Sequence, residues 1–586
     1  MRSFIKIFFA SFLALVIFSV IAFFILALIV GSAIQPSKPD IGSKAVLVLD
    51  LSTDFKEQAQ SNPLSSISGD PSSDQPGLYD IVRMIHYAKS DSSIKGIYIK
   101  ADDNANGFGN SEELRQALID FKQSKKFVIA YGEVITQKAY YVANVADKIY
   151  CHPTGGIEWN GFSSDLFFIK NLLDKLQIQP QIFYAGKFKS ATEPLRVTKM
   201  TDANRLQTTV WLGDLYNNFL LQVSKARNID TATLHQLAIN GSIQTANDAL
   251  KNNLVDGLKY DDEIKSEILN RLSLKQKDEI NFVSFGKYAK AVDFKNSNGK
   301  DKIAIIYAQG DIVGGKGEDG EIGSDNFKNI IRKARLDDNI KAIVFRVNSP
   351  GGSSLASDVI WREISLAKQS KPVVVSMGNV AASGGYFISC NADSIFADAQ
   401  TITGSIGVFS IIPNMQSFFQ NKLGITFDAV KTAPYADLGT ASRPLTETEK
   451  RFLQASVDSI YYTFKSRVAN GRKKNIVFID SIAQGRVWTG QRALGNGLID
   501  RIGSLQDAVA CAARMAKTNN YRTTEYPEPK SLLEQILNTA SNKSIKENSI
   551  KKEIGEQQYN LFNQLKSVQQ MLGTPQARLP FNVDIR

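Results

Sequence analysis

The sequence predicts an α/β protein with two tandem copies of one domain, each a mostly parallel sheet with flanking helices, behind an N-terminal transmembrane helix. Three observations lead to this prediction. Short β-branched runs alternate with stretches of helical periodicity, similar segments recur at an almost constant spacing, and an uncharged apolar segment lies near the start of the chain. Continuous apolar runs are typical of strands buried on both faces, and strand–helix–strand alternation favours right-handed crossovers in a parallel sheet.

The apolar segment covers residues 7–34 and contains no charged side chain. Its length exceeds the ~20 residues that a helix needs to span a bilayer and the ~7–15 of a cleavable signal core. Arg2 and Lys6 precede it, so the positive-inside rule places residues 1–6 in the cytoplasm and the rest of the chain outside. Residues 35–43 then form a linker. A cleaved signal peptide is the alternative, because the small residues of "GSA" suit a signal peptidase.

The rest of the chain repeats itself. Residues 125–161 align without a gap on residues 371–407, a shift of 246 positions. Further on, "LAINGSIQTANDALKNNLVDGL" in the first half matches "IAQGRVWTGQRALGNGLIDRI" in the second half. We therefore expect one copy of the domain over residues 44–290 and a second over residues 300–520.

Two segments fall outside the repeated core. Residues 446–470 have the pattern of a long helix. Residues 521–586 form a polar, lysine-rich C-terminal extension with one amphipathic stretch at 559–572. We interpret that stretch as a helix for packing or for oligomer formation.

Composition excludes several classes of function. The formal net charge is +11, but there is no concentrated basic block that would follow a nucleic-acid backbone. We therefore expect no nucleic-acid partner and instead a mild preference for anionic membrane lipid. Three scattered cysteines are too few for a disulfide framework or a zinc site. We expect neither a metal nor another cofactor.

The two copies differ where chemistry is expected. Ser383 follows an apolar run and stands among alanines and glycines, whereas the first copy has Gln137 at the matching position. The second copy has "SPGGS" at residues 349–353, where the first has "DNANG". The reverse holds for lysine, because Lys189 of the first copy is matched by Ala433. One copy therefore offers a serine and the other a lysine. If the copies pack so that the edges carrying Ser383 and Lys189 meet, the two residues complete one site.

A serine hydroxyl attacks a carbonyl carbon when a neighbouring group takes its proton. The chain has only three histidines, His86, His152 and His235, and each fits a structural position without an evident orienting carboxylate. Lysine can act as the base once burial lowers the pKa of its ammonium group. We therefore predict Ser383 as the nucleophile and Lys189 as its base.

Glycines and serines of the second copy supply the other candidates. A developing oxyanion needs fixed N–H donors, and we assign Gly351 as one donor, with Gly352 and Gly384 in support. Ser405, in "TGSIG", is the candidate that holds the lysine amine toward the nucleophile. Each motif has a structural alternative when it is taken alone: the serine as a helix N-cap, "PGG" as a turn, and the lysine as a surface residue.

At these residues the chain resembles the signal peptide peptidase A (protease IV) family in its long, duplicated form. The similar segments are "RVNSPGGS", "VSMGNVAASGGYFIS", "TGSIGV", "KFKSATEP" and "QGRVWTGQRALGNGLID". The resemblance implies a crotonase- and Clp-like α/β fold, with Ser383 as nucleophile and Lys189 as general base. The neighbouring Lys187 is set aside because the family pattern excludes it and because Lys431 matches it in the second copy.

The resemblance also implies a substrate, an assembly and a location. Substrates would be cleaved signal peptides and other membrane-proximal peptides, and the enzyme would be a homotetramer in contact with inner-membrane lipid. It would be a single-pass protein of the bacterial inner membrane with a periplasmic catalytic part. Two rivals remain: a crotonase-like acyl-CoA enzyme, which the membrane anchor disfavours, and a non-catalytic membrane scaffold, because fold does not fix function.

Overall fold

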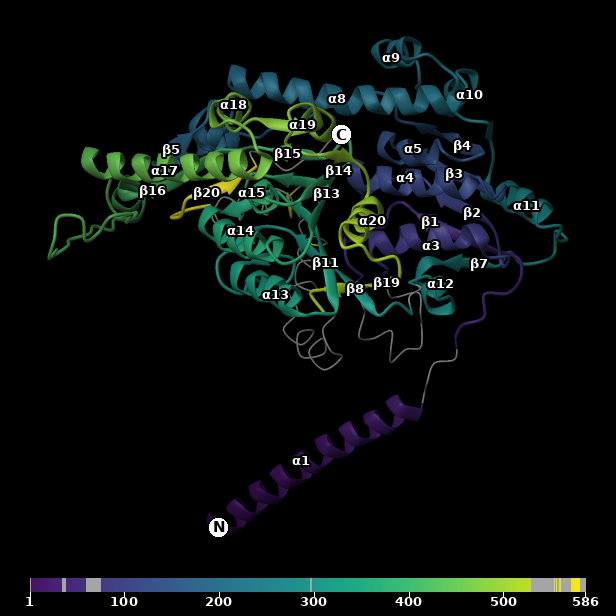
Figure 1. The fold of residues 1–586 in the computed structure, drawn as a ribbon, viewed down its shortest axis with the longest axis horizontal. Coiled ribbons are helices and arrows are strands. Elements are labelled where there is room, and N and C mark those ends of the chain that lie inside the picture. The colour runs from purple at the N-terminus through teal and green to yellow at the C-terminus, as the bar shows by residue number, and fades with distance from the viewer. Residues whose placement is uncertain are drawn as a thin grey trace.

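The structure, a computed structural model, describes residues 2–33, 38–59, 75–295, 298–528, 553, 555, 558–559 and 571–579. Figure 1 shows two α/β units side by side, with helix α8 (Asp202–Arg227) running over both. Helix α1 (Arg2–Ala33) lies apart from them and begins five residues before the predicted apolar segment. Its segment Phe4–Ala22 is long and apolar enough to cross a membrane, and it is exposed throughout.

The first repeat contains a six-stranded sheet in the order β6-β4-β3-β2-β1-β7, and all of its neighbouring pairs are parallel. Leu47 and Leu49 pack into an apolar cluster on one face, while Val46 packs into another on the opposite face. The continuous apolar run of β1 therefore fits a strand covered on both sides. The strands are β1 (Ala45–Asp50), β2 (Ile94–Lys100), β3 (Phe127–Ile135), β4 (Lys148–Ile157), β6 (Gly257–Leu258) and β7 (Phe282–Ser284). The helices, besides α8, are α3 (Leu78–Ser90), α4 (Phe108–Lys122), α5 (Gln137–Ala143), α6 (Lys170–Leu176), η2 (Ser190–Thr192), α7 (Glu193–Arg196), α9 (Thr231–Ile239), α10 (Ala246–Lys251), α11 (Asp261–Arg271) and α12 (Phe285–Ala291).

The second repeat contains an eight-stranded sheet with the path β17-β15-β13-β11-β8-β19, to which β14 is added beside β13 and β18 beside β14. Every pair in it is parallel except β15 with β17. The strands are β8 (Asp301–Gln309), β11 (Ile340–Ser349), β13 (Val373–Ala382), β14 (Ser394–Ala397), β15 (Ile402–Gly404), β17 (Val487–Thr489), β18 (Arg501–Ile502) and β19 (Tyr521–Tyr526). The helices are α13 (Ser324–Leu336), α14 (Ser354–Lys368), α15 (Gly384–Ser389), α16 (Gln416–Phe418), η3 (Phe419–Leu423), α17 (Glu447–Arg472), α18 (Ile476–Ile482), α19 (Gly490–Gly495) and α20 (Leu505–Met515).

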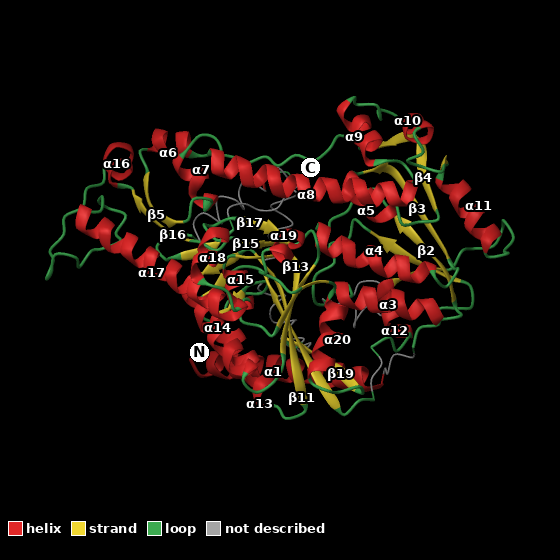
Figure 2. Cartoon of the chain, turned by 45° about the horizontal axis from the view of Figure 1, so that its top comes forward, coloured by secondary structure: helices red, strands yellow, loops and turns green. Residues whose placement is uncertain are grey.

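A third sheet, which the sequence did not reveal, joins the repeats in the order β10-β9-β12-β20-β16-β5. It is mixed, because β9 runs parallel to β10 and β12, whereas β20 runs antiparallel to β12 and β16, and β16 runs antiparallel to β5. Figure 2 shows β5 and β16 together at one end of the molecule, with α17 packed below them. The strands are β5 (Gln179–Ala185), β9 (Ile312–Val313), β10 (Ile322–Gly323), β12 (Gly351–Ser353), β16 (Val408–Asn414) and β20 (Gln576–Arg578).

The long helix expected over residues 446–470 is confirmed as α17. Thr446 and Glu449 form a capping box there, which explains why the helix begins at residue 447. Most of the amphipathic stretch 559–572 lies outside the described residues.

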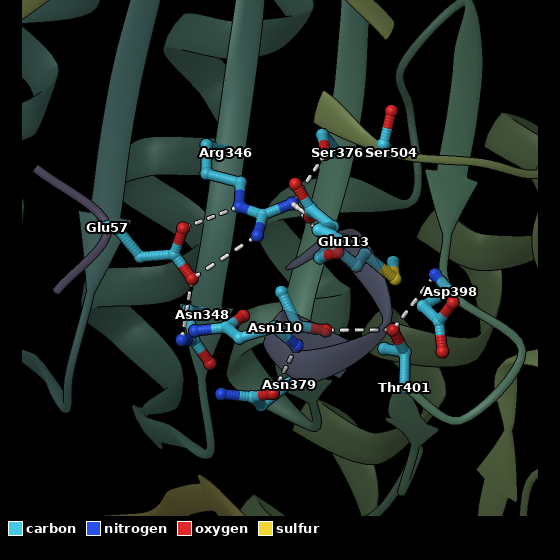
Figure 3. A network of polar contacts seen from close by, with 12 residues as sticks. Glu57, Asn110, Glu113, Arg346, Asn348, Ser376, Asn379, Asp398, Thr401 and Ser504 are labelled. Atoms are coloured by element: carbon cyan, nitrogen blue, oxygen red, sulfur yellow. Dashed lines mark hydrogen bonds and ion pairs between the residues drawn. The ribbon is translucent and has the colours of Figure 1, made fainter. Parts of the chain in front are cut away.

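A buried polar network also joins the repeats (Figure 3). Arg346 of β11 lies 2.8 Å from a carboxylate oxygen of Glu57 and 2.8 Å from one of Glu113, both from the first repeat. Asn348 donates to Glu57 (2.8 Å), and the side-chain oxygen of Asn379 accepts from a backbone N–H of α4 (2.8 Å). Because charges taken out of water need good partners, this network fixes β11 and β13 against the first repeat.

Candidate active site

Ser383 lies at the sharp turn from β13 to α15. Its φ of 55° and ψ of −113° form a conformation that residues other than glycine rarely adopt. Its backbone N–H donates to the carbonyl of Gly404 (2.8 Å), and its fully buried side chain makes no capping bond to the helix. The helix N-cap alternative is therefore wrong for the side chain, and Oγ is free to contact a different residue.

That residue is Lys189, which comes from the other repeat of the same chain. Its Nζ lies 2.8 Å from Oγ of Ser383, 3.1 Å from Oγ of Ser405 and 3.2 Å from the Ser405 carbonyl oxygen. The lysine is only 1% exposed, so the surface alternative is wrong as well. Burial lowers the pKa of Lys189 well below its ordinary value, because the charged form loses its water. A neutral amine can accept the serine proton while its own N–H groups donate to Ser405.

Two glycines let the lysine reach this position. β5 brings the chain in along β16, with Ala185 opposite Val408, and Lys189 follows four residues after the strand pair ends. A Cβ on Gly485 would lie 2.6 Å from the backbone nitrogen of Lys189, and one on Gly407 would lie 3.1 Å from its Cδ. Any larger residue at these positions would push the lysine away, which gives a physical reason for the glycines in "QGRVW" and "TGSIG".

Gln207 of α8 holds the lysine loop and was not predicted from the sequence. Its side-chain nitrogen donates to the carbonyl of Phe188 (3.1 Å) and to Oγ of Ser190 (2.8 Å) on either side of the lysine. Its side-chain oxygen accepts from the backbone N–H of Val487 in the second repeat (3.2 Å). A glutamine inside a long helix carries no local sequence signal for this role.

The glycine segment forms the short strand β12 beside the serine. Gly351 and Gly352 have φ values of 101° and 154°, a region that favours glycine. A Cβ on Gly351 would lie 2.7 Å from the backbone nitrogen of Gly384, so these backbones converge next to the nucleophile candidate. The N–H of Gly351 donates to Oγ of Ser349 (3.2 Å). This N–H therefore has a partner within its own chain, and its role as an oxyanion donor stays a prediction.

The other residues considered from the sequence do not contact Ser383 in the described structure, and several have hydrogen-bond partners of their own. Gln137, which replaces the serine in the first repeat, donates to the carbonyl of Gly161 (2.8 Å) and accepts from its N–H (3.0 Å). Lys187 is exposed. His86 does have a carboxylate partner, Asp120 at 2.9 Å, contrary to the sequence interpretation, but this pair bridges α3 and α4 of the first repeat. Within the described ranges, no group of three His, Cys, Asp or Glu side chains is arranged to hold a metal.

Comparisons with known proteins agree with the duplication. The family described as Peptidase family S49 matches residues 120–275 and again residues 365–519. Protease 4 of Salmonella typhi is 36% identical over 541 residues, covering 88% of this chain and 86% of that protein. The chloroplastic serine protease SPPA of Arabidopsis thaliana is 33% identical over 460 residues, covering 77% of this chain and 68% of that protein.

A solved structure of a mutant of the 1510-N membrane-bound stomatin-specific protease with a substrate peptide is also similar. It is 16% identical and covers 41% of this chain and 98% of its own, with a TM-score of 0.27. The family match in both repeats and the full-length relatives are the findings that identify the protein. The chain belongs to peptidase family S49 and is a serine peptidase of the long, duplicated signal peptide peptidase A form.

Proposed function

We propose that Ser383 and Lys189 form the catalytic dyad of this peptidase. The observation that carries the proposal is the 2.8 Å contact between Nζ and Oγ in a buried setting that lowers the pKa of the lysine. A neutral Lys189 takes the proton from Ser383 as Oγ attacks the substrate carbonyl carbon. The same proton then passes to the leaving amine, and a water molecule hydrolyses the acyl-enzyme.

Ser405 and three backbone N–H groups complete the proposed machinery. Ser405 accepts hydrogen bonds from Nζ through both its hydroxyl and its carbonyl, which orients the amine toward Ser383. For the oxyanion we propose the N–H of Gly351 as one donor, with the N–H groups of Gly352 and Gly384 in support; in this structure the Gly351 N–H donates to Oγ of Ser349. A side chain at position 351 would crowd these donors, since a Cβ there would lie 2.7 Å from the backbone nitrogen of Gly384.

The proposed substrates are cleaved signal peptides and other peptides at a membrane surface. Support comes from α1, whose segment Phe4–Ala22 is suited to a bilayer, and from the relatives named above. Arg2 and Lys6 favour a cytoplasmic N-terminus. We therefore propose a single-pass enzyme of the bacterial inner membrane that contacts its lipid, with repeats 44–290 and 300–520 on the periplasmic side.

We further propose that the enzyme is a homotetramer. A loop projects from the second repeat at the left of Figure 1. Several apolar side chains in and beside this loop are exposed. Exposed apolar side chains that gather in one segment favour a protein interface there. The large apolar residues exposed at the end of η3 and in the projecting loop after it are Leu423, Ile425, Phe427, Val430, Tyr435 and Leu438.

The test is peptide hydrolysis by the full chain in detergent, for the native protein, Ser383→Ala and Lys189→Ala. We expect both variants to lose activity, and a mixture of the two to stay inactive because the dyad forms within one chain. Leucine-rich peptides should be cleaved faster than polar, unstructured ones. Full activity in Ser383→Ala would rule out the dyad, while equal cleavage of polar peptides would rule out only the substrate class.

A further inference from the structure

A basic pocket lies at the edge of the first repeat where its central parallel strands begin. It has a volume of about 420 Å³, and it is lined by the starts of β1 and β2, the segment that leads into β3 and the end of α11. None of its lining residues belongs to the proposed catalytic site. The positively charged residues that line it are Lys44, Lys95, Lys125, Lys126 and Arg271.

Few negative groups compensate these cations. The side-chain nitrogens of Lys44, Lys95 and Lys126 donate to backbone carbonyls at 2.6–3.3 Å. Arg271 forms an ion pair with Glu267 (2.8 Å). Within the part of the chain that the structure describes, no lysine of the pocket forms an ion pair with a carboxylate. The pocket therefore carries a surplus of positive charge that an anion would stabilise.

The same edge of the second repeat differs at a key position. Strand β2 begins with "IKGIYI" and β11 begins with "IKAIVF", so these strands are equivalent. The first residue of β2 is aligned with Ala45 of β1, and the first residue of β11 is aligned with Lys302 of β8. The residues directly before them are Lys44 and Asp301, which makes these two equivalent as well.

This difference reverses a charge at the edge of the sheet. In the second repeat, Asp301 lies 3.9 Å from Nζ of Lys341, so that lysine has an acidic partner. Lys95 is the equivalent of Lys341, and in the first repeat it shares the pocket with Lys44 instead. An internal ion pair in one repeat is thus replaced by two like charges in the other. Like charges repel unless an anion binds between them, so the first repeat has a binding site where the second has a closed pair.

Two apolar side chains, Phe127 and Leu272, complete the lining of the pocket. Both pack in the apolar cluster between α11 and the sheet. Gly96 leaves room for the aromatic ring, because a Cβ there would lie 2.4 Å from a carbon of Phe127. The guanidinium carbon of Arg271 lies 5.6 Å from the centre of the same ring. Cations beside an apolar surface suit a ligand that joins a phosphate to a hydrocarbon chain.

The pocket is close in the chain to the proposed membrane anchor. Lys44 follows Ala33, the last residue of α1, by eleven positions. Because an extended chain spans at most ~3.6 Å per residue, the pocket lies within about 40 Å of the end of that helix. This reach allows the first repeat to rest with its basic edge on the bilayer surface, where anionic headgroups attract lysine and arginine.

We propose that this pocket binds the phosphate of an anionic phospholipid and so holds the first repeat against the membrane, a role that rests on the proposed anchoring through α1. Lys44, Lys95 and Arg271 surround the phosphate, and the ring of Phe127 contacts the glycerol and the first methylene groups of the lipid. A zwitterionic headgroup binds less well, because its own ammonium group is repelled by the lysines.

The test measures lipid binding to the full chain by native mass spectrometry in an uncharged detergent. The probe is phosphatidylglycerol, and phosphatidylcholine is its zwitterionic control. Replacing Lys44 and Lys95 together with glutamine should raise the Kd for phosphatidylglycerol about 25-fold, since each cation near an anionic surface contributes a factor of ~5. The matched control replaces Lys302 and Lys341 with glutamine. It removes the same charge from the equivalent edge of the second repeat and should leave the Kd unchanged.

Lys44→Asp separates lost binding from lost folding. It gives the first repeat the acidic residue that the second repeat has at Asp301, beside an equivalent lysine. We therefore expect an unchanged melting temperature and no remaining preference for phosphatidylglycerol. Equal losses in the two double variants, equal affinity for phosphatidylcholine, or a preference that survives Lys44→Asp would overturn the proposal. Full displacement of the lipid by inorganic phosphate would indicate a site for free anions and would overturn the lipid assignment as well.

Two further measurements separate this site from the proposed function. Carbonate extraction from vesicles tests the anchor, and hydrolysis of a leucine-rich peptide in detergent tests the dyad. The pocket variants should stay in the membrane and cleave the peptide at the native rate. A native chain that is anchored and active but does not prefer phosphatidylglycerol overturns only the lipid site. A chain that carbonate releases refutes the anchor, and with it the role of the pocket.

Discussion

Replacing Lys189 with methionine should lower activity and raise stability at the same time. The methionine side chain fills a similar volume but cannot accept the proton of Ser383. In the described part of the chain, Lys189 is the one titratable side chain that hydrogen-bonds to that hydroxyl. A general base contributes about 10²–10⁴-fold. We therefore expect kcat/KM to fall about 10³-fold, which corresponds to ~4 kcal/mol of transition-state stabilisation.

The effect on stability has the opposite sign. Burial lowers the pKa of Lys189 in the folded chain, while the unfolded chain keeps a value near ~10.4. Between these two pKa values the unfolded chain binds one more proton, so stability rises with pH across this window and the lysine costs stability at neutral pH. Each unit of pKa depression costs ~1.4 kcal/mol. Methionine removes that cost, so the free energy of unfolding at pH 7 should rise by more than about 1 kcal/mol.

The assay pairs peptide hydrolysis with urea unfolding, both measured from pH 5 to 10, and Lys187→Met is the matched control. Lys187 is exposed two residues away, so its replacement should change both quantities little. The native kcat/KM should rise with pH and level off below the ordinary pKa of lysine, since only the neutral amine accepts a proton. A loss of activity under tenfold, or a loss of stability together with activity, would refute the reasoning.

Three further predictions concern the glycine segment, the junction and the assembly. Gly351→Ala should lower kcat for peptide hydrolysis at least ~100-fold, because its Cβ would lie 2.7 Å from the nitrogen of Gly384 at a φ of 101°. The control Gly156→Ala, which has open space around it, should leave kcat unchanged. Arg346→Met should lower the free energy of unfolding, measured in urea, by about 3–5 kcal/mol, since two buried carboxylates lose their cation. The control Lys56→Met, which breaks an exposed ion pair, should lower it by less than ~1 kcal/mol. Val430→Asp on the projecting loop should dissociate the proposed tetramer in light scattering, whereas Val477→Asp, equally apolar and exposed on α18, should leave it intact.

Much of the architecture could be read from the pattern of residues. The longer central strands of both repeats, such as β1 and β13, are largely apolar runs, and the helix at 447–472 begins with a local capping box, so near neighbours in the chain determine them. Comparison of the two copies also singled out Ser383 and Lys189. When two copies share a fold but differ in a reactive residue at matching positions, that difference identifies a candidate functional residue from the sequence alone.

The mixed sheet could not be predicted from patterns in the sequence. Its strands β12 and β20 are three residues long, and each pairs with a segment more than a hundred residues away. Such short segments have no periodicity of their own, and their partner is set by packing of the whole chain. The same limit applies to Gln207, whose role depends on where α8 crosses the second repeat.

The residue types, the duplication and the apolar N-terminal segment are properties of the chain alone, because periodicity and composition are local. The contact of Lys189 with Ser383 required the folded protein, since it depends on β5 pairing with β16 across the two repeats and on Gly485 and Gly407 leaving space for the lysine. Its lowered pKa likewise arises only when packing removes water from the amine. The pairing of β12 with β20 was likewise decided by the packing of the whole chain, since neither three-residue strand has a local pattern of its own.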